Sequence, residues 1–322
     1  MKISIVMPQG TAARTGNQHT AQRWAGFLRK SGHRVGIVEQ WEGAKADVLI
    51  ALHARKSAAS VERFHQAHPD RPLIVALTGT DLYRDIESFP EARRSLELAT
   101  RLIVLQPHGR TRLERRLWPK TRVIFQSADT RLAHRPPSGV FRVIVVGNLR
   151  EEKDPFRAVT ALARLPGEAK AKVEVVQVGG ALSAEMAAEA ARWAKQEPRY
   201  HWRKSLPHAQ AMRALAQSHV LVVSSVMEGG ANVICEAARI GVPVLASRVS
   251  GNIGMLGAGY KGYFPLHDEA RLARLIVRSS VDREFYRSLK QAVVVRRGLF
   301  APLAERAGLA RLVAECAGQS AA

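Results

Sequence analysis

Short runs of apolar, largely β-branched residues alternate along the first half of the chain with longer segments whose apolar positions recur at helical spacing. Residues 18–30 belong to the second kind, because Trp24, Phe27 and Leu28 fall on one face of a helix. Near-continuous apolar strands separated by helices are typical of a parallel sheet that is covered on both faces. The strands predicted on this basis are residues 2–7, 35–38, 47–52, 73–77, 102–105 and 122–125.

The alternation stops at residues 133–139, where two consecutive prolines exclude a helix or a central strand, and then begins again. The second half is predicted to contain strands at residues 141–146, 172–178, 219–224 and 243–247. One helix is predicted to start at residue 155, and two more are predicted at residues 183–195 and 231–240. The pattern therefore predicts an α/β protein of two Rossmann-like βα domains, residues 1–137 and 138–295, whose parallel sheets face each other across a central cleft. Residues 296–322, rich in Ala and Arg, are predicted to form a helix that crosses back to the first domain.

The composition is that of a soluble globular chain, with 46% hydrophobic and 24% charged residues among 322. No uncharged stretch approaches the ~20 residues that cross a bilayer, and no long apolar run follows Lys2, so neither a membrane span nor a signal peptide is expected. The two cysteines, Cys235 and Cys316, exclude a disulfide framework and a cysteine-based zinc site. We therefore expect a cytoplasmic protein.

The net charge is +21, from 49 Lys and Arg against 28 Asp and Glu. It is divided almost evenly, with +11 over residues 1–137 and +10 over the rest, whereas a nucleic-acid-binding arm would concentrate it. The densest basic run, residues 110–122, is predicted to be a helix with Leu113, Leu117 and Trp118 facing inward. An aromatic content of 6% without aromatic–basic interleaving offers no platform for stacking bases. We expect no nucleic-acid partner, and we expect the charge to attract anionic small substrates.

The most informative segment is residues 224–247, which the pattern predicts to run from a strand through a loop to a helix and a second strand. Ligands of open parallel sheets bind at the carboxyl ends of the strands, where this loop lies. Gly229 and Gly230 allow the backbone to approach a ligand closely, and the start of the following helix directs its N–H groups at an anion such as a diphosphate. Glu236 can accept hydrogen bonds from ribose hydroxyls, and Glu228 can face sugar hydroxyls or the anomeric carbon.

Glu228 and Glu236 are separated by seven residues, and with the Gly-Gly turn and the Gly-Val-Pro that starts the next strand the segment resembles the retaining GT-B glycosyltransferases. In that superfamily an Arg and a Lys after the first strand of the second domain hold the donor diphosphate. The resemblance implies the Lys role for Lys153, whereas Asn148 stands where Arg is usual and Arg150 is expected to replace it. The implied catalytic residues are Glu228, Lys153 and Arg150. The donor-binding residues are predicted to be Gly10, Gly16, Asn17, Asn148, Gly229, Gly230, Ala231, Asn232 and Glu236.

The acceptor is expected to bind to the first domain. Sugar-transferring relatives often have a His-Gly pair after the fourth strand, whereas this chain has Thr78 before Gly79. Threonine is no general base at neutral pH, so a nucleophile that is already anionic suits this site. The acceptor-binding residues are predicted to be His53, Arg55, Thr78, Gly79, Thr80, Asp81 and His108.

Four blocks of the chain, residues 49–60, 68–86, 147–159 and 224–244, together resemble the selenosugar synthase family of selenoneine biosynthesis. That family joins selenophosphate to the sugar of a UDP-sugar, with UDP-N-acetylglucosamine as the expected donor, and forms a 1-selenosugar, UDP and phosphate. The resemblance implies that the partners are these small molecules. Lys204 is a departure from the family, whose members often have glycine at the position beside the uracil base of the donor.

Several alternatives stay open. A GT-B enzyme acting on a lipid or saccharide hydroxyl is mildly favoured by the basic run 110–122, and a nucleotide-sugar epimerase or a polyanion-binding protein can share this architecture. The absence of an Asp-x-Asp triplet and of clustered histidines predicts no essential metal, and no cofactor is expected. The stereochemical outcome and the oligomeric state do not follow from the sequence.

Overall fold

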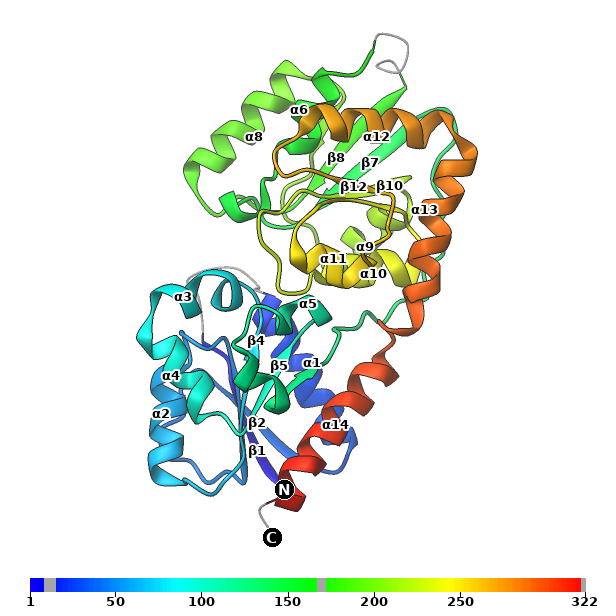
Figure 1. The fold of residues 1–322 in the computed structure, drawn as a ribbon. Coiled ribbons are helices and arrows are strands. Elements are labelled where there is room, and N and C mark those ends of the chain that lie inside the picture. Colours follow the sequence, from blue (N-terminus) through cyan, green and yellow to red (C-terminus); the bar gives the residue numbers. More distant parts are fainter. Residues whose placement is uncertain (9–15, 167–171, 320–322) are drawn as a thin grey trace. The chain divides into compact units, whose positions relative to one another are not determined.

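The computed structural model describes residues 1–8, 16–166 and 172–319. The chain divides into two compact units, the first made of Met1–Ser127 with Pro302–Ala322 and the second of Ala128–Ala301 (Figure 1). Each unit is built on a six-stranded sheet in which neighbouring strands are parallel. The predicted α/β class with two Rossmann-like units is confirmed.

The first unit has the strand order β2-β1-β3-β4-β5-β6. Its strands are β1 (Lys2–Val6), β2 (Arg34–Val38), β3 (Val48–Leu52), β4 (Leu73–Leu77), β5 (Arg101–Val104) and β6 (Thr121–Val123). Its helices are α1 (Gly16–Lys30), α2 (Ala58–Ala67), α3 (Ile86–Ser88), α4 (Pro90–Leu98), α5 (Pro107–Arg110) and α14 (Pro302–Gln319). The strands predicted for this half are all present, with their ends displaced by at most two residues.

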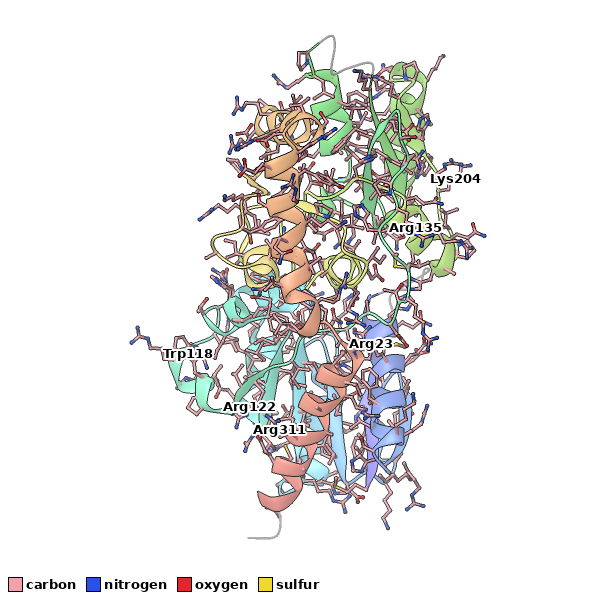
Figure 2. All side chains as sticks on the ribbon, turned by 90° about the vertical axis from the view of Figure 1, so that its right-hand side faces the viewer. Arg23, Trp118, Arg122, Arg135, Lys204 and Arg311 are labelled. Carbon is pink, nitrogen blue, oxygen red and sulfur yellow. The ribbon has the colours of Figure 1, made fainter. Side chains whose placement is uncertain are left out.

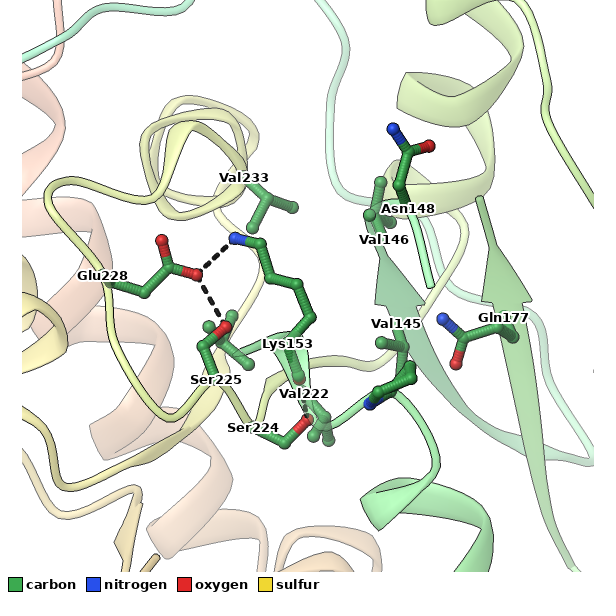
Figure 3. Close-up of a pocket in the computed structure, with 13 residues that line it drawn as sticks. Val145, Val146, Asn148, Lys153, Gln177, Val222, Ser224, Ser225, Glu228 and Val233 are labelled. Carbon is green, nitrogen blue, oxygen red and sulfur yellow. Dashed lines mark hydrogen bonds and ion pairs between the residues drawn. The ribbon is translucent and has the colours of Figure 1, made fainter. Parts of the chain in front are cut away.

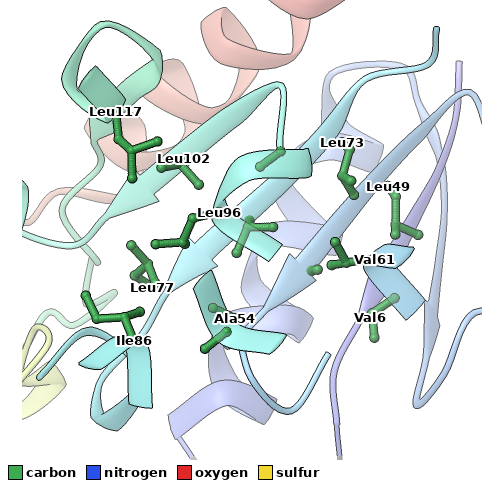
Figure 4. Close-up of a cluster of buried hydrophobic side chains, with 14 of the residues drawn as sticks. Val6, Leu49, Ala54, Val61, Leu73, Leu77, Ile86, Leu96, Leu102 and Leu117 are labelled. Carbon is green, nitrogen blue, oxygen red and sulfur yellow. The ribbon is translucent and has the colours of Figure 1, made fainter. Parts of the chain in front are cut away.

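Apolar side chains fill both faces of this sheet. Neighbouring residues of β3 point to opposite sides, so Leu49 joins the cluster that packs under α2 and α4, whereas Ile50 joins the one that packs under α1 and α14. Figure 4 shows the first cluster, in which Leu49 and Leu96 contribute from a strand and a helix. Trp24 of α1 and Leu309 of α14 lie in the second cluster. Burial on both faces explains why the strands read as continuous apolar runs.

A buried carboxylate attaches the last helix of the chain to the first unit. Glu305 of α14 is 1% exposed and accepts hydrogen bonds from Trp24 Nε1 at 2.7 Å and from Arg23 Nε at 2.8 Å. It also accepts from the backbone N–H of Ser127 at 2.8 Å and from the Ser127 hydroxyl. Arg23 is labelled beside α14 in Figure 2. The contact couples α14 to α1 and to the segment that follows β6.

The basic run 110–122 is not the helix that its spacing predicted. The structure has α5, which ends at Arg110, and a separate 3₁₀ helix at Arg115–Lys120. Pro119 lies inside that 3₁₀ helix, and proline has no N–H for an α-helical hydrogen bond. Leu113 and Leu117 are nevertheless buried, as predicted. Figure 2 shows nitrogen-tipped side chains spread over both units rather than gathered on this run.

The second unit has the strand order β12-β11-β10-β7-β8-β9. Its strands are β7 (Phe141–Val146), β8 (Val173–Val178), β9 (Tyr200–Trp202), β10 (Val220–Val223), β11 (Val244–Ser247) and β12 (Tyr263–Phe264). Its helices are α6 (Arg157–Ala163), α8 (Ala184–Gln196), α9 (His208–Ala216), α10 (Asn232–Ile240), α11 (Ser250–Leu256), α12 (Glu269–Val281) and α13 (Arg283–Val295). The chain runs outward from β7 through β8 to β9 and then returns to β10 on the other side of β7, so the strand order reverses between β7 and β10.

The proline-containing residues 133–139 lie along the second unit. The backbone N–H of Arg135 donates to Ala216 O at 2.8 Å, and His134 Nε2 lies 2.9 Å from Ser218 O. His134 Nδ1 is buried without a hydrogen-bond partner, so a second ring proton would be buried unpaired. Burial accordingly lowers the pKa of His134 to about 4 from its usual 6.5.

This shift predicts a loss of stability in mild acid. A histidine whose pKa is lower in the folded than in the unfolded protein stabilises the fold fully above pH 6.5. This stabilisation is lost as the pH drops from 6.5 toward 4. The free energy of unfolding should therefore fall by as much as about 3 kcal/mol from this residue alone. Urea unfolding at pH 7 and pH 4.5 should show a smaller pH dependence for His134→Asn than for the wild type. His201→Asn, at a ring that is 43% exposed, is the control that should keep the wild-type dependence, and equal dependence in His134→Asn would contradict the assignment.

Candidate active site

A pocket opens in the second unit between the carboxyl ends of β7 and β10, where the strand order reverses (Figure 3). Ligands of doubly wound sheets bind at this position because the loops on either side of it diverge. The pocket is lined by Val145, Val146, Gly147, Asn148, Lys153, Pro155, Gln177, Val222, Val223, Ser224, Ser225, Glu228 and Val233. The apolar residues of this set come mainly from the strands, and the polar residues come mainly from the loops that follow them.

An ion pair stands at the centre of the pocket's polar wall. Lys153, in the loop after β7, places its Nζ 2.5 Å from Oε1 of Glu228, in the loop after β10. The Ser225 hydroxyl donates to the same carboxylate oxygen at 2.6 Å. Glu228 is 8% exposed and the Lys153 side chain 27%, so the carboxylate is buried while the lysine side chain is partly open to solvent. The sequence predicted both residues, and the structure places them in contact.

Hydrogen bonds between the two loops hold this pair in register. The Ser224 hydroxyl lies 3.1 Å from Lys153 O and 2.7 Å from Asp154 O, to which it donates. The backbone N–H of Val226 donates to Glu152 O at 2.9 Å. Asp154 has the left-handed φ of +45°, and its carboxylate accepts from Arg157 Nε at 2.8 Å. The backbone on both sides of the ion pair is therefore constrained.

The amino-terminal part of α11 packs closely against the backbone of Glu228. A Cβ at Gly251 would lie 1.9 Å from Glu228 O, so only glycine allows this approach. The Ser247 hydroxyl donates to Ser225 O at 2.6 Å, and Asn252 Nδ2 donates in turn to Ser247 O at 3.0 Å. These supporting residues were not predicted, because they act through contacts between loops that are distant in sequence.

Helix α10 begins beside the pocket. Ala231 precedes its first residue and supplies no side-chain cap, so the first N–H groups are not capped by a side chain there. Asn232 has a buried Oδ1 with no hydrogen-bond partner, and Val233 lines the pocket. The nine-residue helix ends at Ile240, and the next residue, Gly241, has the left-handed φ of +96° that terminates it. Its positive end is suited to an anionic ligand.

Other predicted donor residues are more dispersed. Glu236 lies on α10 outside the pocket lining, and its Oε1 is 3.9 Å from His208 Nε2. Asn148 lines the pocket, whereas Arg150 is exposed and does not. Gly229 is buried and Gly230 half-buried in the loop after Glu228. Two further predicted residues, Gly16 and Asn17, begin α1 in the first unit, and Gly10 lies outside the described residues.

All the predicted acceptor residues except His108 follow the carboxyl ends of β3 and β4 in the first unit. His53 has a φ of +76° and is 3% exposed, and its Nε2 lies 3.1 Å from Thr80 Oγ1. Nδ1 of the same ring accepts from the Lys56 backbone N–H at 3.4 Å, which assigns the ring proton to Nε2 and makes His53 a donor to Thr80. Burial lowers the pKa of His53, so the ring stays neutral at pH 7. Arg55 stacks over the Phe89 ring at 4.0 Å.

Asp81 connects the loops that follow β3 and β4 through hydrogen bonds to their backbone. It is fully buried, and its carboxylate accepts from the backbone N–H groups of Ala54, Thr78 and Gly79 at 3.0, 3.2 and 2.7 Å. This arrangement holds the loop after β3 against the loop after β4. His108, the remaining predicted acceptor residue, lies on α5. Within the part of the chain that the structure describes, its ring makes no hydrogen bond or ion pair with His53, Thr80 or Asp81.

Two negative observations concern metals and membranes. Across residues 1–8, 16–166 and 172–319, no three His, Cys, Asp or Glu side chains converge in a way that could hold a metal ion. None of the helices described is both long and apolar enough to span a membrane.

The sequence profile of the family "Glycosyl transferases group 1" matches residues 127–293, just over half of the chain, so the protein belongs to this family. No curated protein matches it by sequence. The fold is similar to that of HepE from Anabaena, crystallised with UDP and glucose, with a TM-score of 0.78 at 17% identity over 98% of this chain and 100% of that one.

Sucrose-phosphate synthase from Thermosynechococcus elongatus is similar at a TM-score of 0.79 and 17% identity, over 98% of this chain and 99% of that one. The outer-core galactosyltransferase WaaB, in its apo form, is similar at a TM-score of 0.71 and 11% identity, again over 98% and 99%. The protein is thus a glycosyltransferase with the GT-B fold, as the sequence predicted.

Proposed function

We propose that the second unit binds a UDP-sugar in the pocket between β7 and β10. The observation that carries this proposal is the Lys153–Glu228 pair, set beside the amino-terminal end of α10 where the strand order reverses. Lys153 and the first turn of α10 offer positive charge and N–H donors to a diphosphate. HepE, which has a similar fold, was crystallised with UDP-glucose.

Within this site, electrostatic stabilisation of the leaving group performs most of the catalysis. As the bond between the anomeric carbon and the diphosphate breaks, its electron pair passes to UDP, and the Lys153 ammonium stabilises the charge that develops there. The Glu228 carboxylate, oriented by Ser225, faces the positive charge that develops at the anomeric carbon. No covalent intermediate with the protein is required.

We further propose that the acceptor is selenophosphate and that UDP-N-acetylglucosamine is the donor, as in the selenosugar synthases that four blocks of this sequence resemble. Selenium attacks the anomeric carbon while UDP leaves, and water then cleaves the Se–P bond to release phosphate and the 1-selenosugar. An anionic selenium nucleophile needs no general base. This suits a site in which Thr78 follows β4 and the Nε2 proton of His53 is donated to Thr80.

Mass spectrometry of the products tests this function directly. The pure protein is incubated with UDP-N-acetylglucosamine, with and without selenophosphate. A product with the selenium isotope pattern, together with UDP, is expected only when both substrates are present. UDP release with saccharide or lipid acceptors, but no selenosugar, would replace selenophosphate by a hydroxyl acceptor. UDP release without any acceptor would favour an epimerase, and failure to bind UDP would contradict the donor site.

Gly251 provides a test of how closely Glu228 must be positioned. Gly251→Ala should displace the Glu228 backbone and lower kcat by about 10²-fold, because small misplacements of catalytic groups have effects of this order. Gly259→Ala is the matched control, since a Cβ there meets nothing within 4 Å. Steady-state UDP release by both variants measures the effect, and wild-type turnover by Gly251→Ala would contradict the positioning role.

A further inference from the structure

Gln177 of β8 has no hydrogen-bond partner although it is buried in the pocket wall. The side chain is 1% exposed, and neither Nε2 nor Oε1 makes a hydrogen bond. Figure 3 shows its carboxamide beside Val145, with which Gln177 pairs in register across β7 and β8. A buried amide without partners is destabilising, and such groups are rare in native proteins.

The other buried glutamines among the described residues differ from Gln177. Gln106 donates from its Nε2 to Tyr83 Oη at 2.9 Å, and Gln126 donates from its Nε2 to the Thr20 hydroxyl at 2.5 Å. Both belong to the first unit and lie outside the pocket of the second. Gln177 is thus the buried glutamine that lacks a partner entirely and also the one that lines the pocket.

The position of Gln177 in the sheet does not itself demand a polar residue. Its neighbours along β8, Val176 and Val178, are buried and apolar. Its register partners in the two flanking strands are Val145 and Trp202, and the Trp202 indole N–H already donates to Gly179 O at 2.9 Å. An apolar side chain of similar volume would satisfy the packing without leaving an amide unpaired. A destabilising residue at a pocket is typical of a group whose partner is the ligand.

We propose that Gln177 is a ligand-binding residue whose carboxamide N–H donates to a phosphate oxygen of the bound nucleoside diphosphate. This inference rests on the proposed donor site, because it places the ligand in the same pocket as Lys153 and Asn148. Three rotatable bonds connect the carboxamide to β8, so it can turn from Val145 toward the pocket when an anion enters. The neutral amide adds a directional contact to the charge that Lys153 supplies.

Calorimetric titration with UDP and thermal unfolding of the ligand-free protein together test this proposal. Gln177→Met keeps the volume and removes the amide. It should raise the melting temperature of the ligand-free protein and weaken UDP binding about tenfold, which corresponds to ~1.4 kcal/mol. Gln177→Glu keeps the shape but opposes the diphosphate with a charge, so it should weaken binding further.

Gln126→Met is the matched control, because it removes a buried amide that does have a partner. It should lower the melting temperature and leave the dissociation constant for UDP unchanged. Wild-type affinity in both Gln177→Met and Gln177→Glu would overturn the inference and leave the donor site intact. Absence of UDP binding by the wild-type protein would overturn both the inference and the proposed function.

Discussion

Lys153→Ala is expected to lower kcat for sugar transfer by a factor of about 10² to 10³, the usual effect of removing one preorganised group that stabilises transition-state charge. The variant removes the ammonium that stabilises the departing diphosphate, and it leaves the Glu228 carboxylate with Ser225 as its remaining side-chain partner. UDP release at saturating donor concentration measures the effect. Glu228→Gln, which removes the charge but keeps the shape, should also reduce kcat strongly.

The control for this prediction is Lys195→Ala, which removes a lysine from the exposed end of α8 and changes the net charge equally. The kcat and the melting temperature of Lys195→Ala should equal those of the wild type. Lys153→Ala should melt at a lower temperature, because Glu228 is 8% exposed and loses its cationic partner, so turnover is measured well below both melting temperatures. Turnover by Lys153→Ala within threefold of the wild type would show that this lysine does not act on the leaving group.

Glu305→Ala is expected to destabilise the first unit by about 3 to 5 kcal/mol, the range measured when one partner of a buried charge pair is removed. The variant leaves Arg23, the Trp24 indole N–H and the Ser127 backbone N–H without their acceptor. Because Glu305 joins α14 to α1, we expect the midpoint of urea unfolding to fall markedly. Circular dichroism during urea titration measures this change.

Glu315 of the same helix offers a matched comparison. It pairs with Arg122, but the two side chains are 35% and 38% exposed, and such surface pairs contribute about 0 to 1 kcal/mol. Glu315→Ala should therefore unfold almost as the wild type does. Equal destabilisation by the two variants would mean that loss of helix propensity or net charge, rather than the buried network of Glu305, explains the effect.

The strands of both sheets were predictable from the sequence because burial on two faces requires apolar residues at almost every position. In β3, Leu49 and Ile50 serve different cores, yet both must be apolar. The strand ends were less certain, since a ladder ends where hydrogen bonding stops rather than where the apolar run stops. The short β9 and β12 were not predicted, because three-residue and two-residue strands carry too little pattern.

The helix predicted at residues 110–122 was wrong for a related reason. Apolar spacing describes which side chains point inward, and Leu113 and Leu117 do so. It does not show whether the backbone of the whole run can complete α-helical hydrogen bonds, and Pro119, inside the 3₁₀ helix, has no N–H to donate to one. The Trp118 indole N–H instead donates to Leu113 O at 3.0 Å, a contact specific to the observed turn.

The sequence alone determined the α/β class, the two parallel sheets and the loops that follow β7 and β10, because alternating apolar strands and helices allow few other arrangements. It also indicated Lys153 and Glu228 as candidate site residues. Only the tertiary structure brought them within 2.5 Å of each other and added Ser225, Gly251 and Gln177 to their surroundings. The Lys153–Glu228 contact joins residues 75 positions apart, and the Ser247–Ser225 contact that supports it joins residues 22 positions apart. Their geometry depends on the packed sheet rather than on any local pattern.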